Sequence, residues 1–128
     1  MSLTTALVQI LLADVSVSAI TTRVRPLVLD DPDALPAVVV TPISEPLIER
    51  FGGLPAHATP RVQVDAYADT FDGAESLGAA VYAALQDYSG TSEAVVIQII
   101  RQLTATPVWE SETGRYRAMR DFEVFHNM

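Results

Sequence analysis

The stretch from Arg61 to Gly90 changes its hydrophobic period halfway along, and the rest of the chain is interpreted around it. Residues 61–68 alternate as in a strand with one buried face. One side carries Val62, Val64, Ala66 and Ala68, and the other carries Arg61, Gln63, Asp65 and Tyr67. From Ala74 to Tyr88 the apolar residues recur at helical spacing, which predicts an amphipathic helix over about residues 73–88.

Local signals mark both ends of this helix. Asp72 and Glu75 have the spacing of a capping box, and Ser89-Gly90 is typical of a helix end. The helix is rich in glycine and alanine, including Gly78, so its backbone can approach another element closely. We therefore expect it to lie on the apolar face of a sheet.

The N-terminal half predicts a helix followed by two strands. Residues 2–13 place their leucines and Ile10 on one helical face, whereas residues 14–22 fit either a strand or a short helical turn. Residues 23–29 are expected to form a strand with Pro26 at an edge or bulge, and residues 36–43 a second strand. Their closeness predicts an antiparallel hairpin.

Residues 44–60 predict a long loop, because they contain three prolines and Gly52-Gly53. The loop also carries large apolar side chains, among them Leu47, Phe51 and Leu54. They either fold back on the core or dock on a partner, and we consider Leu47, Phe51 and Leu54 candidate interface residues.

The C-terminal third predicts a central strand and a closing hairpin. Residues 94–103 are almost continuously apolar, as expected of a strand covered on both faces. A turn at 112–114 leads to an alternating strand at 116–125, whose apolar side is interrupted by Arg120. The expected fold is α+β: one domain over residues 1–128, with a mainly antiparallel sheet of about four to five strands. An N-terminal helix and one main helix pack on one face, in the order α-β-β-β-α-β-β.

One face of this sheet is predicted to be polar and exposed to water. Asp65 lies on the polar side of its strand, and Asp121 and Glu123 lie on the polar side of the last strand. This side faces solvent or a water-filled channel.

Composition excludes several classes of function. Eight basic against sixteen acidic residues give a net charge of −8, with no lysine, which argues against a general nucleic-acid binder. The absence of cysteine excludes disulfides and thiolate metal sites. The first apolar run, residues 7–13, lacks the basic flank of a signal peptide and is too short to span a bilayer.

No set of residues indicates catalysis, a metal or a cofactor. The two histidines, His57 and His126, lie in unrelated places, and Asp30, Asp31 and Asp33 fit a turn better than a calcium loop. Glu110 and Glu112 are interpreted as a solvated turn, and no phosphate-binding loop or nucleophile elbow is present. Trp109 either packs structurally or anchors an interface. We therefore expect no enzyme.

Several segments together resemble the small tail-completion, or tail-terminator, proteins of long-tailed bacteriophages and prophages. They are the Ala13-Asp14 step after the first helix, the run LPAVVV from Leu35, the core RVQVDAYADT from Arg61, and the ending ETGRYRAMRDFEVF from Glu112. The resemblance covers nearly the whole chain and contains no catalytic signature.

The resemblance implies a structural virion protein of the neck, assembled in the host bacterial cytoplasm and located at the head–tail junction. It implies a ring, commonly a homo-hexamer, that caps the tail tube and joins it to the head connector. The partners would be further copies of the chain, the tail tube protein and the connector or adaptor protein, with DNA only as cargo and no membrane. A closed ring needs two different complementary patches on each subunit, for which the 44–60 loop and Trp109 are candidates. A negative channel would let DNA slide.

Three alternatives remain at this point. Another neck component, such as a head-completion or connector-adjacent protein, would bind the connector instead of tube ends. A small α+β enzyme would need a pocket of convergent polar groups. A non-viral ligand-binding module would respond to metabolites in a thermal-shift assay.

Overall fold

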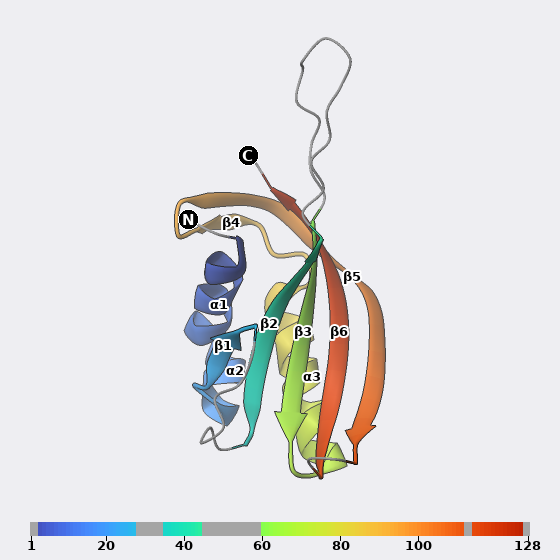
Figure 1. The fold of residues 1–128 in the computed structure, drawn as a ribbon. Helices are drawn as coiled ribbons and strands as arrows, with labels where there is room; N and C mark the ends of the chain where they lie inside the picture. Colours follow the sequence, from blue (N-terminus) through green and yellow to red (C-terminus); the bar gives the residue numbers. More distant parts are fainter. Residues whose placement is uncertain (1–2, 28–34, 45–59, 112–113, 127–128) are drawn as a thin grey trace.

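The computed structural model describes residues 3–27, 35–44, 60–111 and 114–126. In these residues three helices, α1 (Leu3–Ala13), α2 (Val15–Ile20) and α3 (Phe71–Leu85), accompany six strands. The strands are β1 (Val24–Pro26), β2 (Ala37–Ser44), β3 (Arg61–Ala68), β4 (Gly90–Ser92), β5 (Val95–Glu110) and β6 (Arg115–His126). They form one curved sheet in the order β1-β2-β3-β6-β5-β4, and α3 lies across β3 and β6 (Figure 1).

The predicted fold class is wrong. A mainly antiparallel sheet of four to five strands with two helices was expected, but the described residues form a mixed six-stranded sheet with three helices. The expected hairpin of the first two strands is instead a parallel pair, with Val24 opposite Val38 and Pro26 opposite Val40. A strand of three residues rises only about 10 Å. Ten residues lie between β1 and β2, which is more than enough to span this distance, so β2 can begin beside the start of β1 and run parallel to it.

The ambiguous segment after α1 is helical because Asp14 caps it. The Asp14 carboxylate accepts a hydrogen bond from the Val17 N–H at 3.0 Å, which satisfies one of the free amides at the start of α2. At the other end, the Thr21 N–H donates to the Val17 carbonyl.

The predicted ends of the main helix are also wrong. Thr70, not Asp72, is the N-cap of α3, since its hydroxyl accepts from the Gly73 N–H at 3.0 Å. The helix ends at Leu85 instead of residue 88. Asp87 adopts a left-handed conformation (φ 62°) and its N–H donates to the Ile100 carbonyl, which joins the end of the helix to β5 before the chain continues into β4.

The strand expected in the centre of the sheet lies near its edge. In the first part of β5 only Ile97 and Ile100 are fully buried, and a bulge between Ile97 and Ile99 puts both on the helix-covered face. β4 was not predicted. It pairs with β5 through a two-residue turn at Glu93 and Ala94, both with positive φ. Glycine or asparagine usually marks such a turn, and here neither is present.

The core lies between the helices and one face of the sheet, as the periodicity predicted. The largest fully buried side chains come from both layers. They include Leu7 and Leu11 of α1, Leu77 and Leu85 of α3, and Phe122 of β6. The other face of β3 and β6 therefore carries the charged side chains.

Candidate functional site

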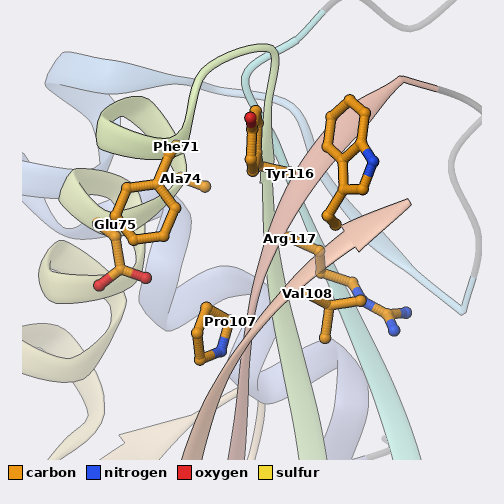
Figure 2. Close-up of a pocket in the computed structure, with 8 residues that line it drawn as sticks. Phe71, Ala74, Glu75, Pro107, Val108, Tyr116 and Arg117 are labelled. Carbon is orange, nitrogen blue, oxygen red and sulfur yellow. The ribbon is translucent and has the colours of Figure 1, made fainter. Parts of the chain in front are cut away.

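Two surfaces stand out: an aromatic groove on the helix-covered side of the sheet, and a charged face on the opposite side. The aromatic groove is lined by Phe71, Ala74, Glu75, Pro107, Val108, Trp109, Tyr116 and Arg117, and has a volume of about 260 Å³. Figure 2 shows Phe71 and Glu75 of α3 on one side and Pro107 of β5 on the other, with Tyr116 nearby.

The aromatic side chains of the groove support one another. Trp109 and Tyr116 lie opposite each other on β5 and β6, with ring centroids 4.6 Å apart. Phe71 meets Tyr116 edge to face at 6.0 Å. Trp109 is still 52% exposed and Phe71 48% exposed. Large aromatic side chains that are held in place and remain exposed are typical of interface anchors.

The charged face runs over β3, β6 and β5. Its basic residues are Arg61, Arg101, Arg115 and Arg117, and its acidic residues are Asp65, Glu110, Asp121 and Glu123. Four charges of each sign balance over these residues. The excess negative charge of the chain therefore does not come from this face.

Glu110 holds the two arginines at the start of β6. Arg115 Nε donates to Glu110 Oε1 at 2.9 Å, and Arg117 Nη1 lies 3.6 Å from Glu110 Oε2. The Arg115 guanidinium also lies 4.8 Å from the ring centre of Tyr67. Glu110, expected in a solvated turn, is therefore part of an ion-paired cluster.

Asp65 is buried within the charged face. It is 3% exposed, accepts from Gln63 Nε2 at 2.8 Å, and lies 3.9 Å from Arg117 Nε. Burial raises the pKa of Asp65 above its usual 3.8, although the Gln63 hydrogen bond and the Arg117 charge act in the opposite direction. In the single chain this carboxylate is therefore shielded from solvent.

The other two carboxylates predicted on this face lie further along β6. Asp121 Oδ2 accepts from Thr104 Oγ1 at 3.1 Å and lies 3.5 Å from Arg61 Nη2. Glu123 lies opposite Arg61 on β3 and Arg101 on β5. The structure brings Asp65, Asp121 and Glu123 onto one face, as the alternation indicated.

The remaining predicted residues are placed as follows. Trp109 lies in the aromatic groove, whereas Leu47, Phe51 and Leu54 fall outside the described residues, as do His57, Glu112 and the three aspartates at 30, 31 and 33. Sequence reasoning did not identify Phe71 and Tyr116 as neighbours of Trp109. Their sequence separation gave no sign of this, because only the pairing of β5 with β6 and the position of α3 bring them together.

The described residues contain no cluster of three or more histidine, aspartate or glutamate side chains placed to hold a metal ion. Within the same residues, no helix has the length and apolar content needed to cross a membrane. The groove is lined mainly by aromatic and aliphatic side chains.

Comparison with protein families decides the class. The sequence matches the family described as Tail completion protein gp17 over residues 5–127. The chain belongs to this family. As a tail completion protein it is a structural component of a phage-like virion, as the resemblance predicted.

A solved structure has the same fold as this tail completion protein. A chain of the structure titled "Virion of native gene transfer agent (GTA) particle" superposes with a TM-score of 0.74 at 21% identity. The match covers 98% of this chain and 94% of the other. No functionally curated protein matches the sequence significantly.

Proposed function

We propose that this tail completion protein is a tail terminator, which forms a homo-hexameric ring on the end of the tail tube and joins it to the head connector or adaptor protein. The family match over residues 5–127 is the observation that carries the proposal. The ring is assembled in the host bacterial cytoplasm, and its place in the virion is the head–tail junction.

The aromatic groove supports the assembly part of this proposal. A ring of identical subunits buries two different surfaces of each subunit. Trp109 belongs to a surface that contacts a partner protein in the assembly, since half of its surface is exposed beside Phe71 and Tyr116. Leu47, Phe51 and Leu54 contribute further apolar contacts in the ring or with the tube.

The charged face lines the channel through which DNA passes, with Asp65, Asp121 and Glu123 among its acidic residues. Each of its four arginines lies beside a carboxylate: Arg61 beside Asp121, Arg101 beside Asp87, Arg115 beside Glu110, and Arg117 beside Glu110 and Asp65. A phosphate passing this surface would meet few cations without a carboxylate beside them. DNA therefore slides as cargo because local pairing, and not a net negative charge, keeps the arginines from holding it.

A pair of matched substitutions tests the channel. Glu110→Gln leaves Arg115 without its carboxylate and Arg117 with Asp65 alone, whereas Glu123→Gln removes the same charge from a residue that forms no ion pair within the described structure. We expect only Glu110→Gln to increase retention of DNA by the protein at low salt, with the effect lost as salt rises. Equal retention by both variants would show that net charge alone matters and would refute the pairing argument.

The function is tested with phage or prophage tails made without this protein. Abnormally long or polydisperse tubes in electron micrographs, restored to uniform length by the wild-type protein, are the expected result. Tails of normal length that still join to heads would end the proposal. Binding of the purified protein to the connector but not to tube ends would indicate another neck component.

A further inference from the structure

The outer edge of β5 has no neighbouring strand over its second half. β4 pairs only with Val95, Val96 and Ile97, although β5 continues to Glu110. The next residues are covered by the end of α3, since the Asp87 N–H donates to the Ile100 carbonyl and the Gln102 N–H donates to Gln86 Oε1, both at 2.8 Å. From residue 103 to 110, no strand in the described part of the chain pairs with this edge.

The register shows which backbone groups face outward. The Val124 N–H donates to the Pro60 carbonyl, on the β3 side of β6, so the even-numbered residues of β6 direct their backbone groups toward β3. The residues of β5 opposite those positions consequently direct theirs away from β6. They are Ala105, Pro107 and Trp109.

These positions match the chemistry of an open edge. Pro107 has no N–H, and at an outward position its presence removes no hydrogen bond to β6. The edge therefore offers the carbonyls of Ala105, Pro107 and Trp109 and the N–H groups of Ala105 and Trp109. All three residues are exposed.

The aromatic groove lies along the same edge. It is bounded by Pro107 and Trp109, and a smaller hollow of about 150 Å³ continues it toward Ala105 and Arg120. Phe71 and Glu75 of α3 border both hollows. A helix beside an open strand edge suits strand addition, in which an added strand bonds to the edge and places alternate side chains in the groove.

The charge of the α3 side indicates which residues would fit. Glu75 borders the groove. Asp72 lies in the first turn of α3, and Asp69 lies just before the N-cap residue of that helix. None of these carboxylates forms an ion pair within the described residues. A basic side chain next to an apolar one would therefore complement both the carboxylates and the aromatic rings.

We propose that the open edge of β5 receives an extended segment of another virion protein. An apolar side chain of that segment packs against Phe71, Trp109 and Tyr116, and an arginine or lysine faces Glu75. The proposal rests on membership of the tail completion family and not on the ring.

The edge strand β1 of a second copy is a poorer donor than a full extended segment. β1, at the other end of the sheet, has three residues. Arg23 and Leu27, on either side of it, bond to β2, so Arg25 between them also directs its backbone groups toward β2. The outward groups of β1 therefore belong to Val24 and Pro26, which together have one N–H. β1 of a second copy would therefore offer one N–H group for the three outward carbonyls of β5.

Amide hydrogen exchange of the full-length protein, alone and in purified tails, tests the proposal. In the isolated protein the Ala105 and Trp109 amides should exchange fast, while the Thr106 and Val108 amides, which point toward β6, should exchange slowly. In tails the two outward amides should slow by about 100-fold or more. Unchanged fast exchange in tails would overturn the proposal. Protection already present in the purified oligomer would also overturn it, because the added strand would then come from a second copy.

Proline substitution gives an independent readout. Ala105→Pro removes an outward N–H and should leave the melting temperature nearly unchanged while reducing incorporation into tails at least tenfold. The matched variant Thr106→Pro removes an inward N–H and should lower the melting temperature. Normal incorporation of folded Ala105→Pro would refute the proposal; if that variant does not fold, the wild-type exchange measurement decides.

The outcome is separable from that of the proposed function. If tails made without the protein have normal length, the terminator role is refuted. If the two outward amides are nevertheless protected in wild-type tails, the proposal of an added strand still holds. Defective tail length in the absence of the protein, together with unprotected amides in wild-type tails, would support the terminator role and refute the added strand.

Discussion

Gly78 allows α3 to lie directly on β6, and its replacement by alanine tests that packing. A Cβ atom at Gly78 would lie 2.9 Å from Ala118 Cβ and 3.0 Å from Arg120 Nε. Carbon atoms are best separated by about 3.5–4.0 Å. Because Ala118 Cβ is attached directly to the β6 backbone, the helix or the strand must shift.

The magnitude follows from two opposing effects. In an unhindered helix, Gly78→Ala would stabilise the protein by about 1 kcal/mol. Overpacking of a tight contact costs about 1–3 kcal/mol. We therefore expect a net loss of about 0–2 kcal/mol in the free energy of unfolding.

Urea denaturation followed by circular dichroism measures this difference, with an unchanged dependence on urea as a check on two-state unfolding. Ala79→Gly, at an exposed position of the same helix, calibrates the helix-propensity effect and should cost about 1 kcal/mol. Combining Gly78→Ala with Ala118→Gly should recover stability beyond the sum of the single changes. A stabilisation of about 1 kcal/mol by Gly78→Ala alone, without coupling to Ala118, would refute the close contact.

Three further predictions concern stability. Leu85→Ala should destabilise the protein by about 2–5 kcal/mol in chemical denaturation, because Leu85 is fully buried beneath the end of α3; a loss below about 1 kcal/mol would contradict that packing. Thr70→Ala should cost about 1 kcal/mol by loss of the N-cap, and more than Asp72→Ala, which removes only a charge near the helix start; the reverse order would restore Asp72 as the cap. Asp65→Asn tests the raised pKa of Asp65. A folded-state pKa above 3.8 makes the wild type gain stability relative to the variant as pH falls from 7 toward 4, whereas the opposite trend in melting temperature would show that the Gln63 hydrogen bond and the Arg117 charge together outweigh burial.

The charged face and the aromatic groove differ in how far they can be predicted from sequence. Alternation along β3 and β6 was enough to place Asp65, Asp121 and Glu123 on one side, because neighbouring strands share the same two faces. Alternation says nothing about which charges meet. The pairing of Glu110 with Arg117 depends on the register of β5 with β6, and the groove depends on where α3 crosses the sheet.

The sequence alone determined the elements that carry a strong local period: α1, β3, the middle of α3, and β6. Their side-chain spacing decides which residues are buried, whatever the neighbours are. Tertiary structure alone decided the parallel pairing of β1 with β2, the β4 turn at Glu93 and Ala94, and the open edge at Ala105 and Trp109. Strand direction, register and the identity of an edge depend on contacts between residues far apart in the chain, and no local pattern records those contacts.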